Sequence, residues 1–423
     1  MLTFFSSLSQ GGLFIRYRAA MLFLSRCSIV LLLYGVAASM ALASIGSVLA
    51  VVFWVLTFDW IRPWLRLRRL PTFWPLILLP FLIVFGTTYS VAPFEYAYRY
   101  FSVYSRFFVI LVIIIVIDDA TWQKRCWFSF FTGAAVTLFS TYLGVWFVLP
   151  WSQSQTTGFG ANHSVFYDYI AQGVMTSFLA VVALSQVLTE KITSRRVLWL
   201  FVFVFAVFSI THLLAGRTGQ VVCTMALLGV ISIALPPRKA LIFAGFFILS
   251  VVVLFLTSPV MSQRFTLLVS EIYAYEQGQE MTSIGARLAM WKASLNFYWD
   301  QPLWGHGTGS YRWLTERLFT DPLMCAMSCV HPHNQFLFFG VEYGLLGLFI
   351  YGWLFVGVAK IVLLVERRYS LILAGLLTII SVDSFINSPF WISSERNFYT
   401  AVLALTMTSF YLNRSFSDER LER

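Results

Sequence analysis

Apolar runs alternate with short polar segments along most of the 423-residue chain. Twelve of these runs approach or reach the length at which a helix crosses a bilayer, about 20 mostly apolar residues. The expected spans are 24–39, 42–59, 73–89, 103–117, 127–149, 165–188, 197–214, 219–235, 240–258, 335–358, 370–387 and 397–412. This pattern predicts an all-α, polytopic membrane protein of about twelve transmembrane helices.

One long segment, residues 259–334, interrupts the apolar pattern. It carries many charged residues, several tryptophans and the helix-like stretch "GARLAMWKASLNFYW". Connections of this length are usually functional or disordered, and amphipathic helices of this kind rest at membrane interfaces. We therefore expect three parts: spans one to nine in 1–258, a partly helical cap loop in 259–334, and spans ten to twelve with a tail in 335–423.

Composition and charge placement support this topology. Hydrophobic residues make up 59% of the chain and charged residues 11%, which is too little charge for a soluble domain. With the N-terminus in the cytoplasm, 20 of the 29 basic residues fall on the cytoplasmic side, as the positive-inside rule requires. The net charge of +10 thus reports membrane orientation and gives no support to nucleic-acid binding. Both termini are expected in the cytoplasm and the cap outside.

Two cysteines, Cys325 and Cys329, fall in the expected cap, and two interpretations stay open for them. A disulfide fits an oxidising outer compartment. The alternative is a metal site, because the spacing C-x3-C-x-H-x-H adds His331 and His333 as ligands.

The stretch "HPHNQ", residues 331–335, precedes the tenth span. Pro332 ends any helix before it, and Asn334 can cap the helix that follows. His333 then lies at a helix N-terminus, which disfavours positive charge and keeps the imidazole neutral, as a general base requires. The alternative is a histidine that is merely hydrogen-bonded in a helix cap. The sequence does not predict in which direction the side chain of His331 points.

Two arginines have the chemistry to bind phosphate oxygens. Arg217 lies in a short turn between two spans, "LLAGRTGQ", where glycines let a ligand approach and the guanidinium offers a planar fork of donors. Arg287 begins the amphipathic stretch "SIGARLAMWKAS" of the cap. The alternative for Arg217 is a side chain that extends to the membrane interface, and the alternative for Arg287 is an ordinary solvated residue.

The glycine-rich stretch "GHGTG", residues 305–309, has no preceding strand and lies on the outer side. A nucleotide-binding loop is therefore excluded, and we expect a turn in which Gly305, Gly307 and Gly309 allow tight backbone geometry.

The motifs together resemble a known family. His333 and Asn334 are followed by Gly344 and Gly347 in a G-x-x-G pattern, and the preceding loop contains "R-L-x-x-W" and "P-L-W-G-x-G". This arrangement, with about twelve spans, resembles the O-antigen ligase and polymerase superfamily of bacterial membrane glycosyltransferases. The resemblance implies a GT-C-like fold and transfer of a glycan from undecaprenyl pyrophosphate, with inversion and without metal, nucleotide or other cofactor.

The resemblance also implies roles for individual residues. Arg217 and Arg287 match the positions that bind pyrophosphate, and His333 matches the histidine that activates the acceptor hydroxyl. Arg99 and Arg106, in the aromatic stretch "FEYAYRYFSVYSRF", and His331 are candidate contacts for the acceptor. The expected location is the inner membrane of a Gram-negative bacterium, with the active site facing the periplasm.

Three acceptors distinguish members of this superfamily. We expect a ligase that uses lipid A–core oligosaccharide, because the chain is compact and no soluble domain follows the last expected span. An O-antigen polymerase and a protein O-oligosaccharyltransferase are the alternatives.

A transporter of lipid-linked glycans is an alternative of another class. Transporters place ionisable groups near the bilayer midplane and often show repeat symmetry between halves. Here the carboxylates Asp168, Glu342 and Asp383 lie toward the outer ends of their spans, and the halves do not match. This pattern favours an enzyme at the membrane interface.

Overall fold

The computed structural model describes residues 12–60, 64, 67–257, 259–278 and 281–412. All regular secondary structure in these ranges is helical. The helices before the cap are α2 (Gly12–Ala38), α3 (Met40–Val55), α5 (Phe73–Gly86), α6 (Phe94–Tyr104), α7 (Phe107–Val116), α8 (Ala120–Leu143), α9 (Tyr169–Thr189), α10 (Thr193–Phe208), the π-helix η1 (Ser209–Leu213), α11 (Arg217–Ala234) and α12 (Pro237–Thr257). Then follow α13 (Pro259–Glu276), α14 (Ser283–Asp300), α15 (Ser310–Leu318), α16 (Pro322–Ser328), α17 (Gln335–Leu364), α18 (Arg367–Ile386) and α19 (Ser393–Met407).

Each expected span coincides with a helix or a helix pair, so the all-α, polytopic prediction is confirmed. Within the described ranges, eight helical segments are long and apolar enough to cross a membrane. One of them, Phe94–Val116, joins α6 and α7. The helices α3 and α5 are apolar but shorter, and α12 and α19 occupy the remaining two expected positions.

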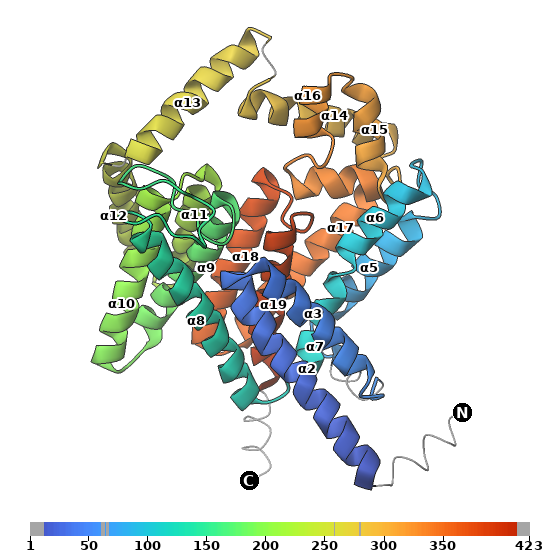
Figure 1. Cartoon of the computed structure of the whole chain (residues 1–423), viewed down its shortest axis with the longest axis vertical. Coiled ribbons are helices and arrows are strands. Elements are labelled where there is room, and N and C mark those ends of the chain that lie inside the picture. The colour runs from blue at the N-terminus through green and yellow to red at the C-terminus, as the bar shows by residue number, and fades with distance from the viewer. Residues whose placement is uncertain (1–11, 61–63, 65–66, 258, 279–280, 413–423) are drawn as a thin grey trace.

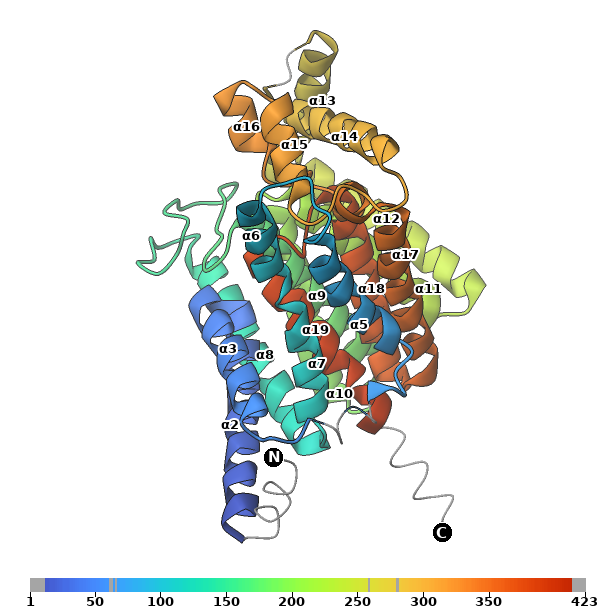
Figure 2. The same cartoon turned by 90° about the vertical axis from the view of Figure 1, so that its right-hand side faces the viewer.

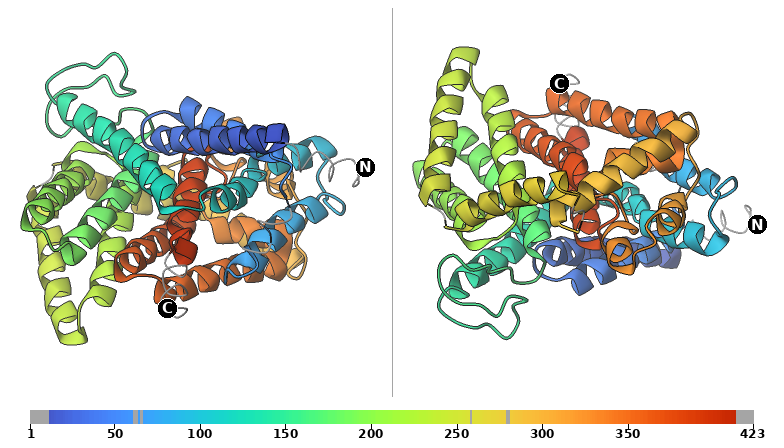
Figure 3. Two further views of the ribbon diagram at one scale, coloured as in Figure 1. Left: turned by 90° about the horizontal axis from the view of Figure 1, so that it is seen from below. Right: turned by 90° about the horizontal axis from the view of Figure 1, so that it is seen from above.

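The helices form an upright bundle with α13–α16 across one end, which we call the cap (Figures 1 and 2). Seen from above, α13 and α14 cross the end of the bundle (Figure 3). The helix α7 is apolar on all sides and buried except at Phe108, as expected for a helix inside a bundle. The N-terminal end of α2 lies at the opposite end from the cap (Figure 1).

Polar side chains define where several helices begin. Asp119 accepts hydrogen bonds from the backbone N–H groups of Thr121 and Trp122 at the start of α8. Asn334 accepts one from the N–H of Leu337 at the start of α17. Such caps satisfy backbone donors that have no partner inside the helix. The expected N-terminal helix cap at Asn334 is confirmed.

Two glycines bring α9 and α11 into close contact. A Cβ atom on Gly219 would lie 2.8 Å from the Cα of Gly173. Because Arg217 precedes Gly219 by two residues, this contact fixes the start of α11, and with it Arg217, beside the start of α9.

The loop at residues 302–309 inserts against a kink in α17. Gly344 adopts a positive φ of 60° inside the helix and interrupts it. The freed backbone pairs with the loop: the N–H of Leu345 donates to the carbonyl of Pro302 at 2.7 Å, and the N–H of Gly307 donates to that of Glu342 at 2.8 Å. The three glycines of "GHGTG" all have positive φ, which confirms the expected tight turn.

Candidate active site beneath the cap

His333 lies in a strap of four residues, 331–334, between the cap and α17. Its φ of 48° is unusual for a residue with a side chain and costs on the order of 1–3 kcal/mol. Neighbours on both sides hold the strap. The indole of Trp291 on α14 donates to the carbonyl of Pro332 at 3.0 Å, and the amide of Asn334 donates to the carbonyl of Phe385 on α18 at 3.0 Å. Strain retained in this way is characteristic of functional sites.

The imidazole of His333 has a partner at one of its nitrogens. Its Nδ1 lies 3.2 Å from the Oδ1 atom of Asn387, just after α18. The Nδ2 atom of Asn387 donates to both carboxylate oxygens of Glu395, each at 3.0 Å. His333 is therefore connected to a buried carboxylate through one amide.

The ring of His331 lies beside that of His333, with centroids 4.3 Å apart and planes inclined at 57°. Burial, followed by the positive charge of Arg287, lowers the pKa of His333 to about 4. Burial, followed by His333 and Arg287, lowers the pKa of His331 well below its ordinary value. Both rings are therefore neutral at neutral pH.

Arg217 opens α11, directly after Gly216 and a few residues after the π-helix η1. Its Nη2 atom lies 3.6 Å from Oε2 of Glu271 on α13, so it also touches the cap. Its Nη1 atom is buried and has no hydrogen-bond partner among the described residues. A buried guanidinium donor without a partner is costly in an isolated protein and is ready to bind an anionic ligand.

Arg287 projects from α14 toward the same place. Burial, followed by the nearby charge of Arg217, lowers the pKa of Arg287, while Tyr169 and Glu271 oppose this effect. Within the described part of the chain, no carboxylate forms an ion pair with Arg287. Arg287 on α14 thus lies near both Arg217 of α11 and His333 of the strap, and the two arginines carry more positive charge than Glu271 offsets.

Arg99 and Arg106 lie elsewhere in the bundle. Arg99 is exposed on α6. Arg106 lies at the junction of α6 and α7, where its Nη1 atom donates to the hydroxyl of Ser47 at 2.7 Å. It also lines a cavity of about 940 Å³ between α3, α5, α6 and α7, whose other lining residues are almost all apolar. Arg106 is connected to the strap only indirectly. Its positive charge acts on Arg396, and Arg396 directly follows Glu395 in the chain.

Several residues at the site did not emerge individually from the sequence: Tyr169, Glu271, Asn387, Glu395 and Arg396. Arg396 is buried, donates from Nη1 to the carbonyl of Trp391 at 2.7 Å, and leaves Nε without a partner in the described residues. The available signal was the density of polar residues in "VDSFINSPFWISSER", between two apolar spans. The positions of these polar residues in the sequence did not show which of their side chains face His333.

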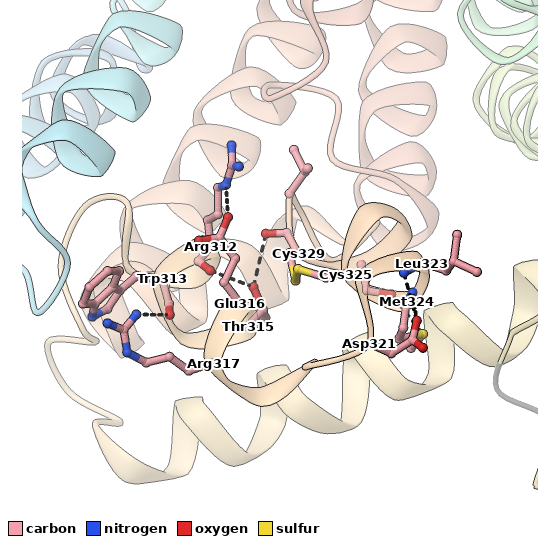
Figure 4. Close-up of a disulfide and its surroundings, with 12 residues drawn as sticks. Arg312, Trp313, Thr315, Glu316, Arg317, Asp321, Leu323, Met324, Cys325 and Cys329 are labelled. Atoms are coloured by element: carbon pink, nitrogen blue, oxygen red, sulfur yellow. Dashed lines mark hydrogen bonds and ion pairs between the residues drawn. A yellow bond between two sulfur atoms is a disulfide. The ribbon is translucent and has the colours of Figure 1, made fainter.

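Cys325 and Cys329 are joined in a disulfide at α16 (Figure 4). The disulfide prediction is confirmed, and neither sulfur is a free thiolate for the alternative metal site. Among the described residues, no group of three His, Cys, Asp or Glu side chains is arranged to hold a metal ion.

Comparison with known proteins adds one match. Residues 203–352 match the family model described as O-antigen ligase. No curated protein matches the chain. The matched segment contains Arg217, Arg287 and His333, whereas Arg106 and Asn387 lie outside it. Residues 203–352 are thus similar to the O-antigen ligase family, and the chain that carries them is a multi-pass membrane protein.

Proposed function

We propose that this protein is an O-antigen ligase of the Gram-negative inner membrane. It transfers an O-antigen glycan from undecaprenyl pyrophosphate to lipid A–core oligosaccharide, with the cap facing the periplasm. One observation carries the proposal: two arginines without full charge compensation and a neutral histidine converge beneath the cap. All three lie in the segment that matches the O-antigen ligase family.

Arg217 and Arg287 bind the donor pyrophosphate. Guanidinium groups bind phosphate oxygens through paired, charge-assisted hydrogen bonds, and here an Arg217 donor is already buried without a partner. The bound anion also relieves the repulsion between the two arginines. As the sugar leaves, the charge that develops on the terminal phosphate is stabilised by the same donors.

His333 acts as the general base. Its Nε2 atom accepts the proton of an acceptor hydroxyl, whose oxygen forms a bond to the anomeric carbon as the bond from that carbon to the pyrophosphate oxygen breaks. Attack opposite the leaving group inverts the anomeric centre. The products are the extended lipid A–core and undecaprenyl pyrophosphate, and the proton on His333 passes to solvent or to the departing phosphate.

The acceptor approaches from the side of Arg106. The cavity beside Arg106 is apolar along its walls, suits acyl chains, and has a guanidinium and hydroxyl groups among its lining. Arg99, exposed on the preceding helix, and His331, beside His333, complete the candidate contacts. Phosphates of the core oligosaccharide supply the complementary negative charge.

The test is reconstitution of purified protein with undecaprenyl-pyrophosphate glycan and EDTA, supplied in parallel with lipid A–core, a second lipid-linked glycan, or a serine-containing peptide. We expect glycan-capped lipid A–core only. Extension of the lipid-linked glycan would identify a polymerase, and a glycosylated peptide would identify a protein O-oligosaccharyltransferase. Movement of donor between leaflets without transfer would identify a transporter and contradict the proposal.

A further inference from the structure

We propose that Asn387 and Glu395 are a positioning pair that holds His333 in the tautomer needed for catalysis. The inference rests on the proposed role of His333 as the base. The inference adds Asn387 and Glu395 to the candidate site. Both lie outside the segment that matches the family model, at the junction of α18 and α19.

The direction of each hydrogen bond follows from the chemistry of the carboxylate. One atom of Asn387 lies 3.0 Å from both oxygens of Glu395, and the donating Nδ2 suits this place better than an amide oxygen. The Oδ1 atom of Asn387 then faces His333, 3.2 Å from Nδ1. A carbonyl oxygen can only accept, so Nδ1 carries the proton. The lone pair is left on Nε2, which is the atom that the proposed reaction uses.

Burial makes this choice of tautomer strict. Asn387 is 2% exposed and Glu395 is 1% exposed, so water does not replace either partner. If Asn387 turned its amide over, Oδ1 would face the two carboxyl oxygens of Glu395, and this contact between acceptors would be unfavourable in a buried place. The unflipped amide avoids that contact and presents Oδ1 to His333.

The backbone fixes both members of the pair. The N–H of Asn387 donates to the carbonyl of Asp383 at 2.7 Å and closes α18. Glu395 lies in the first turn of α19. Asn334 ties the strap to the same end of α18 through Phe385. The strained His333 and its partners are therefore held by one connected frame.

A neutral amide between histidine and carboxylate has a chemical consequence. A carboxylate in direct contact would raise the pKa of His333 and favour its protonation before the acceptor arrives. The amide sets the tautomer and leaves the ring uncharged. After proton transfer, the imidazolium still donates through Nδ1 to Asn387, whose dipole is aligned by Glu395.

The experiment compares Asn387→Leu, Asn387→Asp and Glu395→Gln with Ser388→Ala, a buried neighbour whose hydroxyl has no partner among the described residues. For Asn387→Leu we expect kcat to fall by about 10–100-fold with little change in KM for the donor, in line with other supporting residues. For Asn387→Asp we expect the acid limb of kcat/KM to move to higher pH, because the new carboxylate raises the pKa of His333. Ser388→Ala is expected to keep the wild-type rate.

A second measurement does not depend on activity. The chain has five histidines, so ¹⁵N-histidine spectra can be assigned to His333 by comparison with His333→Ala. We expect the Nδ1–H tautomer in the wild type and a mixture of tautomers in Asn387→Leu. The Nε2–H tautomer in the wild type would overturn the pairing.

The two proposals fail in different ways. An inactive His333→Ala together with an unchanged rate and pH profile in Asn387→Leu would refute the positioning pair alone. An active His333→Ala would refute the base itself and, with it, the proposed chemistry.

Discussion

His333 is neutral for reasons that reach beyond its place at a helix N-terminus. The sequence predicts that place, and the structure confirms it through Asn334. The larger causes of the low pKa are burial and then Arg287, which lies 46 positions earlier in the chain. A sequence pattern reports on residues that are neighbours along the chain. Burial and the position of Arg287 depend instead on contacts between segments that are distant in the sequence.

The first prediction concerns pH. A base must be neutral, so activity is lost as pH falls through the pKa of His333. In the free enzyme that pKa is about 4, so the acid limb of kcat/KM should lie well below the ordinary histidine value of about 6.5. Bound pyrophosphate adds negative charge and raises the pKa of His333, so the acid limb of kcat should lie at higher pH than that of kcat/KM.

The measurement is a pair of pH–rate profiles at saturating and limiting donor. Coincident acid limbs near pH 6.5 would show that neither burial nor Arg287 governs the histidine.

The second prediction concerns Arg287. Arg287→Ala removes the proposed phosphate contact and a charge that lowers the pKa of His333. We expect kcat/KM for the donor to fall by about 10²–10³, the usual effect of losing one donor to a developing anion, and the acid limb to move to higher pH. Arg287→Lys keeps the charge without the planar fork and should move the acid limb less. The matched control is Lys292→Ala, an exposed cation on the same helix.

Sequence reasoning singled out three residues of the candidate site and missed the residues that contact them, for a physical reason. Arg217, Arg287 and His333 each lie in a locally recognisable motif. Asn387 and Glu395 gain their role only because the end of α18 meets the strap, a contact between residues 54 positions apart. No local pattern encodes that contact.

At the scale of elements, hydrophobic periodicity predicts the helices well and their ends less well. The fifth expected span begins at 127, whereas α8 begins at Ala120 because Asp119 caps it and polar residues continue the helix beyond the apolar run. The tenth begins at Gln335, as expected, but α17 continues to Leu364 rather than ending at 358. Helices extend past the apolar window when caps and flanking polar residues support them.

The third prediction tests the kink of α17. A side chain at Gly344 would meet a positive φ and place its Cβ 2.5 Å from the carbonyl carbon of Leu303. Gly344→Ala should therefore destabilise the protein by roughly 1–3 kcal/mol or more, because both the backbone and the inserted loop must shift. Gly352→Ala, on the same helix with open space around its Cβ, is the control and should be neutral or slightly stabilising.

Thermal unfolding in detergent measures both variants. Equal melting temperatures for Gly344→Ala and Gly352→Ala would show that the loop does not depend on the kink.

At the scale of the whole molecule, the cap and the bundle contribute to one site. Arg217 comes from the bundle and pairs with Glu271 of the cap, while Arg287 comes from the cap and faces the strap. The cavity beside Arg106 lies in another part of the bundle, between α3, α5, α6 and α7. Under the proposed function, this arrangement would give the donor and the acceptor separate approaches to His333.

The fourth prediction follows from this separation. Reversing both charges in Arg99→Glu/Arg106→Glu should raise KM for lipid A–core roughly tenfold or more and leave KM for the donor unchanged, since charge-assisted contacts to phosphate would be lost. Steady-state kinetics with each substrate varied in turn supplies the test. An unchanged KM for the acceptor would place acceptor binding elsewhere.

The central claim is that His333, which lies near Arg287, activates the acceptor. Single-turnover transfer in EDTA, with preformed complex of enzyme and lipid-linked glycan, tests it most directly. The account predicts that His333→Ala retains donor binding and loses transfer by about 10²–10⁴, the usual contribution of a general base, while Lys292→Ala reacts at the wild-type rate. Transfer by His333→Ala at a near wild-type rate would contradict the account.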